Sequence, residues 1–169
     1  MKAREISYAG VMEALSIIFL FLASVLPKGN SLFYILSSVC VMIIVWLYNI
    51  KLGLLVYMTT SLLSFIIVPN KLVTVLYVLI FGLYPVFKAI CERGFPIYIE
   101  FGLKLLFYNI ALIILYFVFK IIMKEIPHFK FGIALTVASS EIIFVLYDYL
   151  LTLILQKLKS FKIPWREKL

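Results

Sequence analysis

Residues 31–68 read SLFYILSSVCVMIIVWLYNIKLGLLVYMTTSLLSFIIV, an apolar run that Lys51 and Gly53 interrupt near its middle. As one helix this run would be about 57 Å long at 1.5 Å per residue, nearly twice the ~30 Å hydrocarbon core of a bilayer. We therefore expect a tight hairpin of two membrane-spanning helices, at residues 32–50 and 52–68.

The composition of the whole chain agrees with a membrane protein. Hydrophobic residues make up 65% of the sequence and aromatic residues 17%, and the mean hydropathy is +1.15. Soluble domains contain roughly 45–50% apolar residues. Only helices and closed barrels satisfy their backbone groups in lipid, and the apolar runs lack the alternation of barrel strands. The sequence predicts an all-α, polytopic helical bundle, with residues 1–169 forming a single integral membrane domain.

Six helices are expected, at residues 6–26, 32–50, 52–68, 72–90, 97–122 and 131–155. Turn residues separate the first three of them from their successors, and the basic segment 156–169 is expected to lie at the membrane interface. The sequence FGLYP, Phe81 to Pro85, falls inside the fourth helix. Glycine and proline at mid-helix predict a kink that frees backbone carbonyls.

The distribution of lysine and arginine predicts the orientation. An even number of spans places both termini on one side of the membrane. If that side is the cytoplasm, eleven of the 16 Lys and Arg residues lie inside and five outside, as the positive-inside rule requires. We expect a multi-pass protein of the bacterial inner membrane with both termini cytoplasmic. The net charge of +8 is then explained by attraction to anionic lipid, with no role in nucleic-acid binding.

Residues typical of enzyme sites are scarce. The single histidine, His128, cannot supply a two-histidine metal site, and neither a nucleophile elbow nor a glycine-rich phosphate loop occurs. Cys40 and Cys91 are expected at different depths in the membrane, so no disulfide is predicted. The sequence predicts no enzymatic activity, no cofactor and no bound metal.

Polar residues within the expected helices favour packing roles. In the first helix, Ala9, Glu13 and Ser16 share a face with Leu20, and Gly10 with Ala14 forms a small-residue pair beside it. In the third helix, the hydroxyls of Thr59, Thr60, Ser61 and Ser64 are expected to bond to their own helix. In the fifth helix, Glu100 and Lys104 are spaced to satisfy each other.

The segment SSEIIFVLYDYLL, Ser139 to Leu151, carries two carboxylates in an apolar helix. Glu141 and Asp148 are seven residues apart and therefore share one helix face, together with Thr152. They are separated by roughly 10 Å along the axis, too far to share a proton directly. We expect this face to contact protein, with Glu141 in the outer half of the membrane. Asp148, in the inner half, is expected to pair with Lys104 or with the Glu13 face of the first helix.

This layout resembles the S-components of energy-coupling-factor transporters, which are the substrate-binding subunits of these importers. The resemblance rests on six compact helices, cytoplasmic ends, a tight inner turn between helices two and three, and small residues on helix one. In that family small residues, typically A-x-x-x-A, pack against a transmembrane coupling subunit, and separate ATPases supply energy. Here Gly10 and Ala14 take that place. The run from Pro69 to Pro85 is also similar to that of small uncharacterised clostridial membrane proteins.

The resemblance implies a pocket near the outer face for a vitamin-like molecule or a metal, built from helices four to six and the first outer loop. The candidate substrate-binding residues at the outer rim and inside the bundle are Asn30, Asn70, Lys71, Tyr77, Tyr116, Ser140 and Glu141. An MreD-like scaffold of a cell-envelope assembly has the same size and helix count and is the alternative. A transporter needs a hydrated pocket with convergent polar groups, whereas a scaffold can be packed shut.

Overall fold

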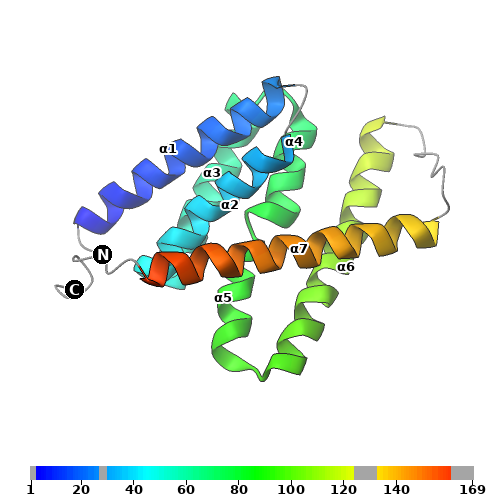
Figure 1. Cartoon of the computed structure of the whole chain (residues 1–169). Helices are drawn as coiled ribbons and strands as arrows, with labels where there is room; N and C mark the ends of the chain where they lie inside the picture. The colour runs from blue at the N-terminus through cyan, green and yellow to red at the C-terminus, as the bar shows by residue number, and fades with distance from the viewer. Residues whose placement is uncertain (1–2, 27–29, 124–132, 161–169) are drawn as a thin grey trace. The chain divides into compact units, whose positions relative to one another are not determined.

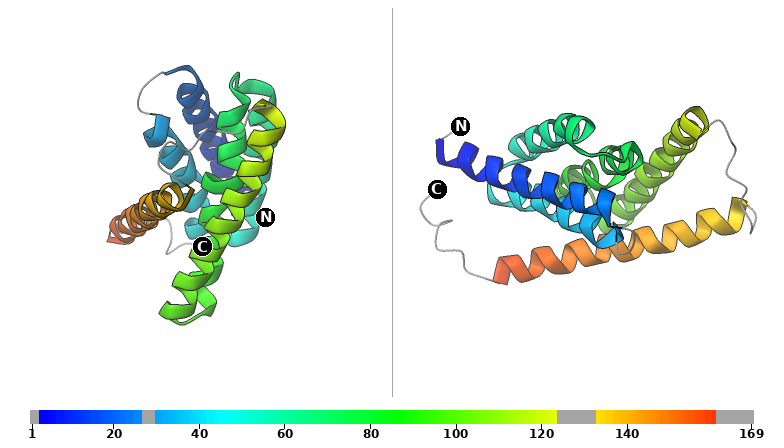
Figure 2. Two further views of the ribbon diagram at one scale, coloured as in Figure 1. Left: turned by 90° about the vertical axis from the view of Figure 1, so that its right-hand side faces the viewer. Right: turned by 90° about the horizontal axis from the view of Figure 1, so that it is seen from above.

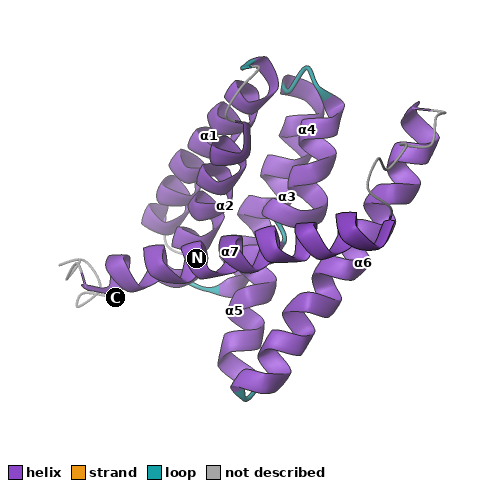
Figure 3. Ribbon diagram, turned by 45° about the vertical axis from the view of Figure 1, so that its right-hand side comes forward, coloured by secondary structure: helices purple, strands orange, loops and turns teal. Residues whose placement is uncertain are grey.

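A computed structural model describes residues 3–26, 30–123 and 133–160, and all secondary structure in these ranges is helical (Figure 3). The helices, in chain order, are α1 (Ala3–Val25), α2 (Asn30–Leu47), α3 (Ile50–Ile67), α4 (Lys71–Leu76), the π-helical turn η1 (Tyr77–Phe81), α5 (Tyr84–Gly94), α6 (Ile97–Met123) and α7 (Ile133–Ser160). The predicted all-α fold is confirmed, and each expected helix has a counterpart.

Five of the described helical segments are long and apolar enough to cross a membrane, with Lys71–Gly94 counted as one span across α4, η1 and α5. The remaining apolar helix, Ser31–Leu47 within α2, is shorter. Large apolar side chains cover the outside of these helices. Leu62 is 68% exposed and Ile66 79%. An exterior of this kind is stable in lipid, so the chain is a membrane protein.

Most boundaries differ from the expected ones by a few residues; α1 begins at Ala3 and α5 extends to Gly94, four residues beyond the expected end. The turn after α2 lies at Tyr48 and Asn49 instead of at Lys51, because the Asn49 side chain accepts a hydrogen bond from the backbone N–H of Leu52 at 2.7 Å and begins α3. At the other end, α7 continues to Ser160, so the expected interfacial segment from Gln156 starts as helix. His128 and residues 161–169 lie outside the described residues.

The chain divides into two compact units, residues 1–115 and 116–169, and α6 runs from the first into the second. In the first unit, α1 packs along α2 and α3 (Figures 1 and 2). Among its described residues, two apolar clusters contribute to its core. One contains Ala9, Val41, Ile44, Val45, Leu52, Val56 and Val86. The other contains Leu20, Ala23, Tyr34, Val68, Val73 and Tyr77.

Gly53 permits the close approach of α3 to α2. A Cβ atom built at this residue would lie 2.1 Å from Cγ2 of Val45. The glycine therefore serves helix packing within the hairpin and not the turn itself.

The span Lys71–Gly94 is interrupted at the predicted place. After α4 the backbone adopts the π-helical turn η1, in which the N–H of Gly82 donates to the carbonyl of Tyr77 at 2.7 Å. Pro85 then stands in the first turn of α5, where its missing N–H costs no helical hydrogen bond. The Tyr57 hydroxyl donates to the carbonyl of Val78 at 3.0 Å and so satisfies a backbone group in the interrupted stretch.

Candidate functional site

Four charged residues of the first unit lie together between α5 and α6. Lys88 Nζ lies 2.9 Å from Glu92 Oε1, and Lys104 Nζ lies 3.4 Å from the same oxygen and also contacts Glu100. The side chains of Lys88 and Lys104 are only 3% and 5% exposed, whereas Glu92 is one-third exposed. We call these four residues the ionic network. It confirms the predicted Glu100–Lys104 pair and joins two helices through Glu92.

The ionic network links α5 to α6, and loss of a carboxylate partner would be costly for either buried ammonium group. Aromatic stacking supports the same contact. The rings of Phe87 and Phe107 are 4.6 Å apart and nearly parallel, and Tyr84 packs on Phe107 at 5.9 Å. Cys91 is buried beside the network at 1% exposure. It is a free thiol in this structure, as is Cys40.

A second set of polar residues lies in the interior of the first unit, between α1, α2, α3 and η1. The hydroxyls of Ser16 and Ser37 are 2.5 Å apart and both residues are fully buried. Thr60 and Tyr77, also at 0% exposure, lie with them. We call these four residues the hydroxyl layer. In α1 the predicted inward face is correct for Ala9, Ser16 and Leu20, and Glu13 is half-buried.

Two of the predicted rim residues shape the turn between α3 and α4. The Asn70 side chain accepts from the N–H of Leu72 at 3.1 Å, and its backbone N–H donates to Ser24 Oγ at 3.0 Å. Lys71 Nζ donates to the carbonyls of Phe65 at 2.5 Å and Val68 at 3.0 Å. The ammonium group therefore caps the end of α3. Asn30 begins α2, and its side chain is outside the described part of the structure.

The other predicted site residues divide between the two units. Tyr77 is fully buried in the first unit. In the second, Tyr116 is 37% exposed with its ring edge-on to Phe117, and Ser140 donates to the carbonyl of Val137 at 2.8 Å. Glu141 is half-buried. Each unit thus carries part of the predicted set, and the shared pocket stays a prediction.

The carboxylates of α7 lie beside its buried stripe. The stripe contains Phe144, Tyr147 and Leu151. Glu141 and Asp148 are half-buried at its edge, and Thr152 Oγ1 donates to the carbonyl of Asp148 at 2.9 Å. The two acids share a face, as their spacing predicts.

No family model, no curated protein and no solved structure matches this chain. The chemistry therefore has to be argued from the residues themselves. Among the residues that the structure describes, no group of three or more His, Cys, Asp or Glu side chains is placed to hold a metal ion.

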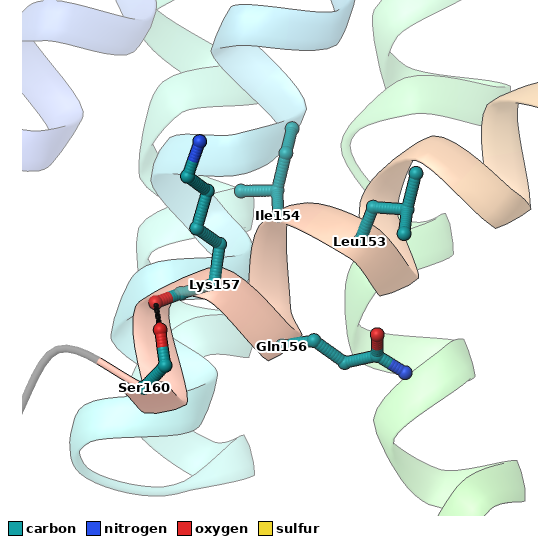
Figure 4. A pocket seen from close by; sticks show the side chains of 5 residues that line it. All are labelled: Leu153, Ile154, Gln156, Lys157 and Ser160. Carbon is teal, nitrogen blue, oxygen red and sulfur yellow. Dashed lines mark hydrogen bonds between the residues drawn. The ribbon is translucent and has the colours of Figure 1, made fainter.

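A shallow recess lies along α7 (Figure 4). Its lining residues are Leu153, Ile154, Gln156, Lys157 and Ser160, all from this one helix. Ser160 Oγ donates to the carbonyl of Lys157 at 2.8 Å, so this hydroxyl is already satisfied. The recess is a surface hollow between side chains of a single helix and lacks the convergent polar groups of a binding site.

The sequence did not reveal the ionic network in full. The spacing of Glu100 and Lys104 indicated one pair, and the spacing of Lys88 and Glu92 carries the same i,i+4 signal. The link between the helices, from Glu92 to Lys104, depends on how α5 and α6 face each other. No spacing along the chain could have indicated it.

Proposed function

We propose that this protein is a membrane-embedded substrate-binding subunit without catalytic activity, of the kind found as the S-component of energy-coupling-factor importers. Its substrate would be a vitamin-like small molecule or a metal. A transmembrane coupling subunit and ATPases would be its partners, in the bacterial inner membrane with both termini cytoplasmic.

The outward face of α1 is the observation that carries this proposal. Gly10 and Ala14 are exposed, and a Cβ atom built at Gly10 would meet nothing within 4 Å. Ala9, Ser16 and Leu20 turn inward on the same helix. Small residues on an exposed membrane helix allow the backbone of a second helix to approach closely. The first unit therefore leaves its small-residue pair available to another membrane protein.

The residues proposed to bind the substrate are those of the predicted outer site. Ser140 and Glu141 are half-buried and neighbours on α7, and Asn70 is exposed at the α3–α4 turn. A half-buried carboxylate in a membrane helix is expected to bind a cation, a hydrogen-bond donor or a partner residue. Tyr77 is inaccessible in this conformation, so its contact with a substrate would require the bundle to open.

Co-expression with the coupling subunit and ATPases encoded in the same genome tests whether the chain associates with them. Replacement of either small residue, by Gly10→Leu or Ala14→Leu, should lower the recovery of the coupling subunit with the tagged chain by roughly tenfold, equivalent to about 1.4 kcal/mol. Val11→Leu is the matched control, because Val11 is 57% exposed on the same helix. Equal recovery with all three variants would contradict the proposal.

A membrane scaffold is the second candidate, and the closed interior of the first unit favours it. Residues from α1, α2, α3 and α5 fill that interior, with seven buried side chains in the larger apolar cluster. A scaffold would use the same exposed α1 face but would bind no small molecule. Retained association through Gly10 and Ala14 together with failure to bind any substrate would support the scaffold.

A further inference from the structure

The hydroxyl layer lies between the two apolar clusters of the first unit. In α1, Ser16 stands between Ala9 of one cluster and Leu20 of the other, and in α2, Ser37 stands between Val41 and Tyr34. Thr60 follows Val56 of the first cluster and precedes Val68 of the second. Three helices thus each place one buried hydroxyl at the same level, and Tyr77 of η1 adds a fourth.

Only half of this layer is satisfied by direct hydrogen bonds. Ser16 and Ser37 bond to each other at 2.5 Å. The hydroxyls of Thr60 and Tyr77 are completely buried, and among the described residues neither has a partner in hydrogen-bonding geometry. Tyr77 Oη is nevertheless close to the hydroxyls of Ser16, Ser37 and Thr60.

The hydroxyl of Thr60 differs from those of its neighbours on α3, which donate to backbone carbonyls of their own helix. Thr59 donates to the carbonyl of Leu55 at 3.0 Å, Ser61 to that of Tyr57 at 2.7 Å, and Ser64 to that of Ser61 at 2.8 Å. These three confirm the prediction that hydroxyls of this helix bond to their own backbone. The prediction is wrong for Thr60, whose hydroxyl lies beside that of Tyr77.

We propose that the hydroxyl layer binds a water molecule, which bridges Thr60 Oγ1 and Tyr77 Oη. Buried hydroxyls without partners are rare in folded proteins, and buried waters typically make two to four hydrogen bonds to such groups. Each hydroxyl can donate one hydrogen bond and accept two. The four hydroxyls therefore supply enough donors and acceptors for one water.

The composition of the hydroxyl layer favours an uncharged water molecule over a cation. It contains no carboxylate, so a cation held there would lose its hydration without a compensating charge. The interrupted helix accounts for the geometry, because η1 carries Tyr77 and Gly82 lies against its ring. A Cβ atom at Gly82 would lie 2.8 Å from Cζ of Tyr77 and 2.8 Å from Cδ2 of Tyr57. The absence of a side chain at Gly82 therefore leaves room for the Tyr77 ring. This inference does not rest on the proposed transport function.

Thermal melting of purified variants tests whether the two hydroxyls have a partner. Tyr77→Phe and Thr60→Val should each lower the melting temperature by about 2–4 °C, the shift expected for one net hydrogen bond in a chain of this length. The double variant should melt close to the lower single variant, because either change removes the shared water. Tyr57→Phe gives the reference for a direct hydrogen bond, and Tyr98→Phe, at 88% exposure, should leave the melting temperature unchanged. An unchanged or higher melting temperature for Tyr77→Phe would overturn the proposal.

Radiolytic labelling of the wild type in isotopically labelled water tests whether a water molecule lies beside Tyr77. Tyr77 should be oxidised several-fold more than Tyr84, which is equally buried but packs on Phe107. Equal labelling of the two tyrosines would overturn the proposal in favour of a direct Thr60–Tyr77 contact. Melting in sodium chloride and in choline chloride should give the same temperature. A sodium-dependent rise that disappears in Tyr77→Phe would show a cation site and would also overturn it.

Discussion

Replacement of Glu92 by glutamine should destabilise the protein by removing the charge that two buried lysines share. Glu92 Oε1 lies 2.9 Å from Lys88 Nζ and 3.4 Å from Lys104 Nζ. Glutamine keeps the size and the hydrogen-bonding oxygen, so the change isolates the charge. Removing one partner of a fully buried ion pair costs about 3–5 kcal/mol.

The expected cost is lower here because Glu92 is one-third exposed and water screens it. About 2 kcal/mol is a reasonable value, and at 2–4 °C per kcal/mol for a chain of this length the melting temperature should fall by about 4–8 °C. Glu13→Gln, at another half-buried carboxylate outside the network, is the control and should shift it by less than about 2 °C.

Thermal melting in detergent measures the effect, and a double-mutant cycle tests its origin. Lys88→Met alone leaves Glu92 paired with Lys104. The double variant Glu92→Gln/Lys88→Met should be less destabilised than the sum of the two single variants, because one uncompensated lysine has been removed. A melting temperature for Glu92→Gln equal to that of the control, or strictly additive losses, would refute the reasoning.

Three further substitutions, the first with a control variant, test other features. Gly82→Ala should cost about 1–3 kcal/mol, since its Cβ would lie 2.8 Å from the rings of Tyr57 and Tyr77, whereas Gly94→Ala adds a Cβ in open space and should change the melting temperature little; equal effects would contradict the packing. Asn70→Ala removes the N-cap of α4 and should lower stability by about 1 kcal/mol in the same assay. Gly94→Cys should react with a membrane-impermeant thiol reagent only after cells are permeabilised, and reaction in intact cells would reverse the orientation. The exposed Gly94 position is used because Cys91 is buried.

The helices could be predicted from the sequence because length and hydropathy alone constrain a chain in lipid. The 38-residue run from Ser31 to Val68 had to fold back, and it does so between α2 and α3. The exact turn was missed because Asn49 caps α3, while the more conspicuous Gly53 serves packing against Val45. Phe81 to Pro85 indicated the break in the fourth span, and the π-helical form of that break could not be inferred from glycine and proline.

The polar interior was predicted less well than the helices. The inward face of α1 and the Glu100–Lys104 pair followed from helical periodicity. The contacts of Ser16 with Ser37 and of Lys104 with Glu92 join separate helices. They depend on the rotation and axial shift of each helix against its neighbour, and neither quantity is encoded in the spacing along one helix.

A ligand screen by thermal stabilisation tests the proposed binding function most directly. Purified wild-type protein would be melted with a panel of vitamins and divalent cations. One compound should raise the melting temperature saturably, and at a hundred times its dissociation constant the gain should be about 2.7 kcal/mol. The shift should vanish in Glu141→Gln, which is expected to keep the wild-type melting temperature without ligand, whereas Asp148→Ala should melt lower but keep the shift. Failure of every compound, with Glu141→Gln and Asp148→Ala equally destabilised, would contradict the binding function and favour the scaffold.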